Sequence, residues 1–148
     1  MASLAQTSAT TTLSISSTLP STYDATGFQA LTWTPVGEIS NMGTYGAKVT
    51  VVKHIPVDTA VVSKRSGSTD SGTMNLSLAR HAGTDVTKLI AANNSRASIA
   101  VKIAMPSLIG GADYFTAIVT SYQTSVGTAD QILMSSVDLE IDNAIIYT

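Results

Sequence analysis

Apolar and polar residues alternate along most of this chain with a period of two, which is typical of half-buried β-strands. The clearest example is residues 73–80, where Met74, Leu76 and Leu78 alternate with polar side chains. A similar alternation runs through residues 98–105. We predict the main strands over these two segments and over residues 47–55, 114–122 and 131–145, the last as one strand or two. Residues 13–16 are expected to form a short edge strand.

The period changes after residue 83. Val86, Leu89 and Ile90 are spaced by three and four positions, which predicts one amphipathic helix over residues 83–94, with Thr84 as its cap. Residues 23–28 indicate a turn or a single helical turn. Because antiparallel alternation prevails, we predict a mainly β fold, an antiparallel β-sandwich or short barrel with one flanking α-helix.

A long extended loop joins two of the predicted strands. This arm, Pro56–Gly72, carries its own strand signal over Thr59–Lys64, followed by a polar turn rich in Gly, Ser and Asp. Ordinary hairpin loops are far shorter, and an arm that offers backbone hydrogen bonds suits contact between subunits. Lys64 and Arg65 would pair with acidic groups of a neighbour or keep an exposed strand soluble. The candidate inter-subunit residues are Thr59, Val61, Val62, Lys64, Arg65, Gly67 and Asp70.

The composition limits the chemistry. The 148 residues predict one domain, with a net charge of −2 and only 12% charged residues, against about 25% in ordinary domains. A basic face for binding nucleic acid is therefore not expected. The chain has no cysteine, and neither His54 nor His81 has a second ligand at metal spacing. We expect no enzyme activity, no catalytic residues, no metal site and no cofactor.

The N-terminal segment gives little indication of export. Residues 1–23 hold no charge, and they lack both the cationic start and the continuous apolar core of a signal peptide. No run approaches the roughly 18 apolar residues of a membrane-spanning helix, so no membrane partner is expected.

Three carboxylates follow one another at alternate positions near the C-terminus: Asp138, Glu140 and Asp142, which we call the acidic row. A hydrolase would place its two carboxylates across a cleft, whereas these lie side by side on one strand face. A solvated face opposite the core is the simplest interpretation. A third is an anionic wall that lines a water-filled channel and repels DNA phosphates.

The order of several motifs resembles that of the major tail tube proteins of long-tailed bacteriophages. The motifs lie between residues 23 and about 95, in the segments Asp24–Trp33, Val36–Ile39, Gly43–Gly46, Val51–Pro56 and Val62–Thr73. The last third of the chain agrees only in strand pattern and length.

The resemblance implies a structural subunit that forms homohexameric rings, which stack into a hollow tube conducting viral DNA without specific binding. Residues 23–148 would be the tail-tube β-sandwich domain and residues 1–22 a flexible or inter-ring N-terminal segment. The implied partners are further copies of the chain, a tape-measure protein and tail terminator or tip proteins. The implied location is the virion tail, after synthesis in the bacterial host cytoplasm.

A carbohydrate- or receptor-binding β-sandwich module is the alternative function. Such a module would need an exposed aromatic platform. The chain has one Trp, five Tyr and two Phe from which to build it.

Overall fold

The computed structural model describes residues 5–148, and it is mainly β with two helices. In chain order the elements are β1 (Thr12–Ser16), α1 (Ala25–Gln29), β2 (Thr34–Val36), β3 (Ile39–Asn41), β4 (Lys48–His54), β5 (Ser63–Asp70), β6 (Thr73–Ala79), α2 (Thr84–Ser95), β7 (Ser98–Ala104), β8 (Ala112–Ser125), β9 (Met134–Ile141) and β10 (Ile146–Tyr147).

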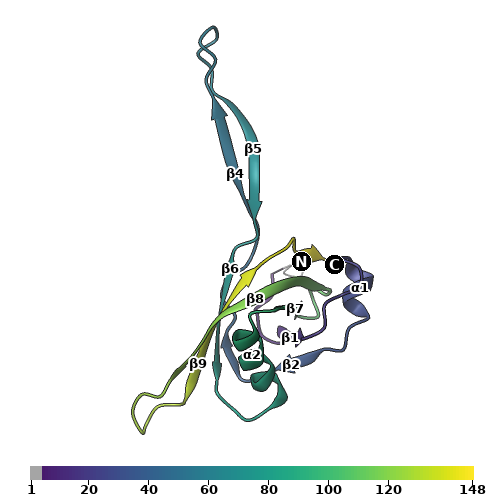
Figure 1. The fold of residues 1–148 in the computed structure, drawn as a ribbon, viewed down its shortest axis with the longest axis vertical. Coiled ribbons are helices and arrows are strands. Elements are labelled where there is room, and N and C mark those ends of the chain that lie inside the picture. Colours follow the sequence, from purple (N-terminus) through teal and green to yellow (C-terminus); the bar gives the residue numbers. More distant parts are fainter. Residues whose placement is uncertain (1–4) are drawn as a thin grey trace.

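One antiparallel sheet forms the body of the molecule (Figure 1). Its strand order is β2-β1-β7-β8-β9-β6-β3, and β10 pairs with β8. The strands at its two ends, β2 and β3, are separated in the chain by only Gly37 and Glu38. The sheet must therefore curl until its two edges come close together. The predicted antiparallel β-sandwich or short barrel is confirmed at the level of fold class.

The inside of the curled sheet is the main hydrophobic core. Met74, Leu76 and Leu78 of β6 are fully buried, as the alternation predicted. The neighbouring strand β9, which pairs with β6, buries Val137 and Leu139 in the same way. Helix α2 packs on this core through three buried residues, Val86, Leu89 and Ala92. Burial of these side chains supplies most of the driving force for folding of the body.

A smaller apolar cluster lies against β7 and β8. Phe28 of α1 is fully buried and stacks on Tyr114, with ring centroids 5.4 Å apart. Trp33 adds a third ring, 6.0 Å from Tyr114. The Asp24 carboxylate caps α1 by accepting a hydrogen bond from the Gly27 N–H at 2.7 Å. The predicted single helical turn is therefore present, so the fold has a second helix.

Two local predictions are wrong. The segment around Leu13 is not an edge strand, because β1 lies between β2 and β7 and buries Leu13 and Ile15. Thr84 does not cap α2, because Gly83 holds the N-cap position and Thr84 is already helical. The helix ends where Arg96 adopts a left-handed conformation with φ 59°.

Candidate inter-subunit surface

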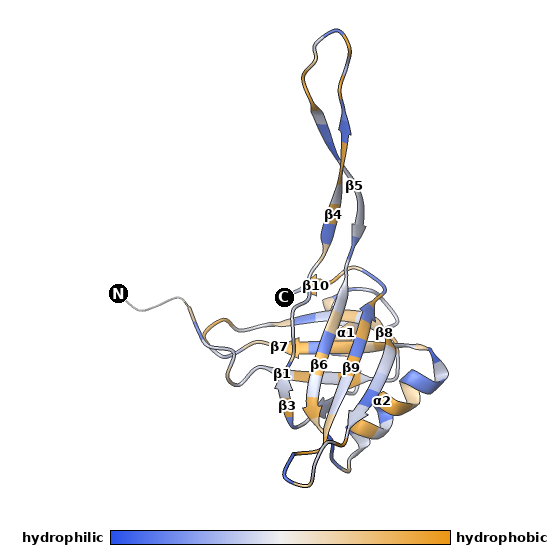
Figure 2. Cartoon of the chain, turned by 90° about the vertical axis from the view of Figure 1, so that its left-hand side faces the viewer, coloured by the Kyte–Doolittle hydropathy of each residue, from blue (hydrophilic) through white to orange (hydrophobic). Residues whose placement is uncertain are grey.

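The β4–β5 hairpin, which spans Lys48–Asp70, is a two-stranded antiparallel sheet of its own. It projects from the body like a stalk (Figure 1), and Figure 2 shows hydrophilic and hydrophobic residues mixed along its whole length. Every residue of β4 is exposed, and so is every residue of β5 except the half-buried Ser63. Because both strands are exposed, the hairpin lacks the packing that normally stabilises a sheet. A two-stranded hairpin without such packing is at best marginally stable in water.

This geometry corrects the predicted arm. The strand expected over Thr59–Lys64 is instead mostly the hairpin tip, since β5 begins only at Ser63. The expected polar turn after Arg65 is instead strand, because Lys64, Arg65, Gly67 and Asp70 all lie in β5. Residues 47–55, assigned to a main strand by their pattern, are the first strand of the projection and take no part in the core.

Gly67 serves a β-bulge rather than a turn. The register shifts between Val49 and Val51, which pair with Thr69 and Ser66. A Cβ added at Gly67 would lie 3.0 Å from the Thr50 carbonyl oxygen and 3.0 Å from the Val52 side chain. Glycine therefore allows the two strands to approach closely at the bulge, which bends and twists the hairpin.

At the base of the hairpin the two strands begin and end close together. Gly72 has a φ of 85°, and a Cβ added there would lie 3.4 Å from the Gly46 carbonyl oxygen. Its N–H donates to the Asp70 carboxylate at 2.9 Å, and its carbonyl accepts from the Ile141 N–H at 3.0 Å. The two ends of the projection thus meet at the edge of the body, where β5 leads into β6.

The tip of the hairpin, residues 55–62, is mostly apolar, and all of it except the half-buried Pro56 is exposed. Val57 is 100% exposed and Val61 is 68% exposed. Ile55 and Val62 are exposed as well. Thr59 lies in the turn between them. Aliphatic side chains clustered at the end of a projection are typical of a surface that another protein covers.

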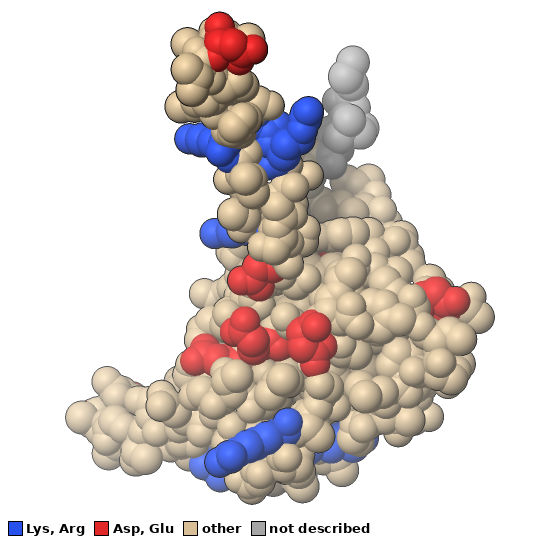
Figure 3. All heavy atoms as spheres, turned by 45° about the horizontal axis from the view of Figure 1, so that its top comes forward, with Lys and Arg blue, Asp and Glu red and all other residues tan. Residues whose placement is uncertain are grey.

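The acidic row lies on the polar face of the body sheet, opposite the core. Asp138 and Glu140 are in β9, and Asp142 follows directly after its last residue. Figure 3 shows acidic side chains gathered in a row near the foot of the hairpin. The predicted alternation is confirmed, because the residues between them, Leu139 and Ile141, are buried.

Neutral donors hold these carboxylates in place. The Thr73 hydroxyl donates to Glu140 at 2.6 Å, and the Asn75 amide donates to Asp138. Two hydroxyls, from Ser98 and Thr116, donate to Asp142. In residues 5–148 no Lys or Arg forms an ion pair with the row. Its negative charge is thus fixed in position, and no cation of the described residues neutralises it.

The two histidines are far apart in the fold. His54 is exposed on β4. The His81 Nε2–H donates a hydrogen bond to the Asp85 carboxylate at 2.8 Å, next to the start of α2. A hydrogen bond with the Ala79 carbonyl, followed by that with Asp85, raises the pKa of His81. Burial opposes ionisation of Asp85, but hydrogen bonds from the Gly37 N–H and His81 lower its pKa. The hydrogen bond from Gly37 to Asp85 thus connects the end of β2 to the first turn of α2.

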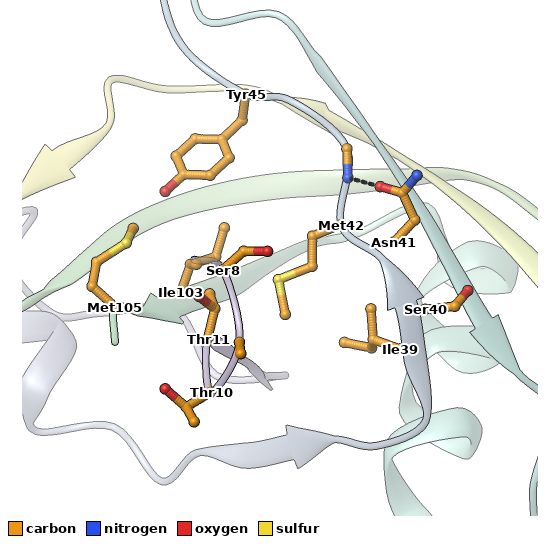
Figure 4. Close-up of a pocket in the computed structure, with 12 residues that line it drawn as sticks. Ser8, Thr10, Thr11, Ile39, Ser40, Asn41, Met42, Tyr45, Ile103 and Met105 are labelled. Carbon is orange, nitrogen blue, oxygen red and sulfur yellow. Dashed lines mark hydrogen bonds between the residues drawn. The ribbon is translucent and has the colours of Figure 1, made fainter. Parts of the chain in front are cut away.

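A groove of about 570 Å³ lies between the N-terminal residues 8–11 and β3 (Figure 4). Its lining is a mixture of hydroxyls and apolar side chains that include Ile39, Met42 and Met105. Burial, and then a hydrogen bond to Asp113, raises the pKa of Tyr45 at one end. The lining contains no carboxylate, histidine, lysine or arginine, so it offers no acid–base pair for catalysis.

Other site classes find no support in the part of the chain that the structure describes. Residues 5–148 contain no cluster of His, Cys, Asp or Glu suited to hold a metal ion. No helix within that range is long and apolar enough to cross a membrane.

No protein-family model matches the chain, and no curated protein sequence matches it. Solved structures do. One chain of the anti-feeding prophage baseplate, 6-fold symmetrised, has a TM-score of 0.72 at 10% identity, over 98% of this chain and 97% of that chain. One from the tail of the empty gene transfer agent particle, with C6 symmetry, has a TM-score of 0.71 at 10% identity, over 97% and 99%. One from the SPP1 tail tube has a TM-score of 0.61 at 13% identity, over 93% and 76%.

At these identities the likeness concerns the fold. It extends over nearly the whole of this chain, including the last third, where the sequence motifs gave no more than a strand pattern. The resemblance to tail tube proteins is thus confirmed at the level of the fold.

Proposed function

We propose that this chain is a structural subunit of a phage-type tail, which assembles with further copies of itself into hexameric rings that stack as a hollow tube. The fold match over at least 97% of both chains in the baseplate and tail structures is the observation that carries the proposal. The 6-fold and C6 symmetries of those two structures favour six copies per ring. An interface between unlike surfaces of identical subunits closes into a ring, and a second such interface stacks rings.

The β4–β5 hairpin is the proposed contact with a second copy. Its two faces and both of its strand edges are free, and its tip exposes Val57 and Val61. Burial of that tip against a neighbour would offset the cost of ordering the projection. Residues 1–22 are a proposed additional contact between rings, beyond the part of them that β1 places in the sheet.

The acidic row is the proposed wall of the channel. Fixed carboxylates without cationic partners would repel DNA phosphates, so that DNA passes without specific binding. In this account the chain resides in the tail of a virion, after synthesis in the cytoplasm of a bacterial host. Its further partners are a tape-measure protein and tail terminator or tip proteins. Catalysis has no part in it.

A carbohydrate- or receptor-binding role finds less support. Trp33, Phe28 and Tyr114 pack on one another, and the Trp33 indole N–H donates to the Phe28 carbonyl at 3.1 Å. Of the aromatic side chains in the described residues, Tyr23 and Tyr147 are exposed. A glycan array with clear hits, from a protein that stays monomeric, would favour this alternative.

Excision of the hairpin tests the proposal. Because Gly46 and Gly72 lie side by side, residues 47–71 can be replaced by a short Gly-Ser turn without loss of any core residue. We expect the excised protein to melt as the parent does and to form no rings or tubes in negative-stain images. Normal assembly of the excised protein would refute the role of the hairpin. Absence of assembly from the intact protein at high concentration would refute the tail-tube function itself.

A further inference from the structure

The register of the β4–β5 hairpin places like charges opposite each other. Lys53 pairs directly with Lys64, and the adjacent pair joins Val52 to Arg65. Opposed residues of a hairpin share one face, so both lysines lie on the same face and Arg65 lies on the other. Figure 3 shows cationic side chains around the middle of the stalk. We call Lys53, Lys64 and Arg65 the cationic band.

No acidic side chain within residues 5–148 forms an ion pair with this band. In the described residues the ion pair that forms is His81–Asp85, on the body. The two acidic residues of the hairpin are at its ends, with Asp58 in the tip and Asp70 opposite Lys48 at the base. Like charges directly opposite each other destabilise a two-stranded sheet. The opposed lysines thus destabilise the free hairpin, so its stability does not explain why they are there.

The neighbours of the band supply that explanation. Val49, Val51 and Val52 are each at least 50% exposed on a ribbon whose strand edges are unpaired. Such a ribbon is a template for a second strand, and identical hairpins on free chains would add to one another. Charged residues, lysine above all, are a common way to prevent that association.

We propose that the cationic band keeps the hairpins of free subunits from pairing with one another. This inference rests on the proposed function, because it assigns to the same hairpin a way to remain unpaired until a different surface of another copy receives it. Since cations lie on both faces, a second hairpin meets positive charge from either side. The hairpin can therefore bind a surface that lacks positive charge, whereas it is repelled by another hairpin.

The size of the effect follows from simple electrostatics. Two hairpins side by side bring the three cations of one band near the three cations of the other. Loss of one cation from each band leaves two cations near two, so fewer pairs of like charges repel each other. With separations near 8 Å and physiological salt, this loss should speed pairing by about fivefold. Added salt should speed pairing of the parent hairpins, because it screens the same repulsion.

The absence of cysteine allows a direct measurement. A Thr59→Cys variant carries one thiol, at the hairpin tip, for a donor or an acceptor dye. Energy transfer in a dilute mixture of the two labelled forms then reports how fast tips of separate chains meet. Two further substitutions are compared in this background. Lys64→Thr removes the like-charge pair, and Lys48→Thr removes one cation that lies opposite Asp70.

We expect Lys64→Thr to raise the initial rate about fivefold and Lys48→Thr to leave it nearly unchanged. In the parent, the rate should rise between 0.05 and 0.5 M salt, values chosen to span the range of strong to weak screening. Equal rates for the two variants, or a parent rate that falls with salt, would overturn the proposal. A slower rate for Lys64→Thr would also overturn it, because the band would then attract another copy. Since dilute free chains are measured, each of these results is independent of tube formation.

Discussion

The apolar tip of the β4–β5 hairpin allows the sharpest quantitative prediction. Val57 is 100% exposed and Val61 is 68% exposed, and neither contributes to the core. If the tip is buried in a second copy, then Val57→Ser with Val61→Ser should weaken assembly without any effect on folding of the body.

The magnitude follows from the area that remains to be buried. Full burial of a valine side chain stabilises by at least about 1.5 kcal/mol. Scaled by the exposed fractions of Val57 and Val61, the pair contributes about 2.5 kcal/mol per subunit. Each 1.4 kcal/mol is a factor of ten, so the critical concentration for assembly should rise roughly 60-fold.

Sedimentation of tubes over a series of protein concentrations measures that threshold. The matched control is Val57→Ile with Val61→Ile, which keeps both positions apolar and suited to a β-hairpin. We expect the isoleucine variant to assemble near the parent threshold, and both variants to melt at the parent temperature. The reasoning is refuted if the serine variant assembles at the parent concentration, since the tip would then remain in water.

Three further predictions concern the body. Leu76→Ala should lower the free energy of unfolding by about 2–5 kcal/mol, because the side chain is fully buried, and urea denaturation measures this. The contact of His81 with Asp85 should stabilise the fold most between the ordinary pKa of an aspartate, 3.8, and the ordinary pKa of a histidine, 6.5. It weakens as pH rises through the raised pKa of His81, and also as pH falls through the lowered pKa of Asp85. The loss of unfolding free energy in His81→Gln should therefore shrink above neutral pH; a loss that stays constant up to pH 9 would contradict this. The parent should bind duplex DNA negligibly at physiological salt, whereas Asp138→Lys with Glu140→Lys should bind in a salt-sensitive way, as read by fluorescence anisotropy; tight binding by the parent would disprove the repulsive wall.

The sequence predicted those parts of the fold whose side chains are buried by the chain itself. In β6, strict alternation predicted which residues face the core, and Leu76 and Leu78 are fully buried. In α2, the spacing of Val86 and Leu89 predicted the packed face. The acidic row was predicted in the same way, since its positions alternate with buried ones. Its partners Thr73 and Asn75 required the pairing of β6 with β9, which no local pattern reveals.

The sequence misled where a strand projects from the body and the chain itself does not cover it. Val49, Val51 and Val52 have the composition of a core strand, yet each is at least 50% exposed. A strand that is selected to be covered by another molecule carries the same apolar residues as one covered by its own sheet. Gly67 was assigned to a turn because glycine favours both turns and bulges, and only the register across the hairpin distinguishes them.

Cryo-electron microscopy of the concentrated protein would show both whether the chain assembles and where the hairpin lies in the assembly. We expect hollow tubes of stacked rings with six subunits each, in which every β4–β5 hairpin lies against a second copy and the acidic row faces the channel. Monomers alone at high concentration, or tubes in which the hairpins extend into solvent, would contradict this expectation.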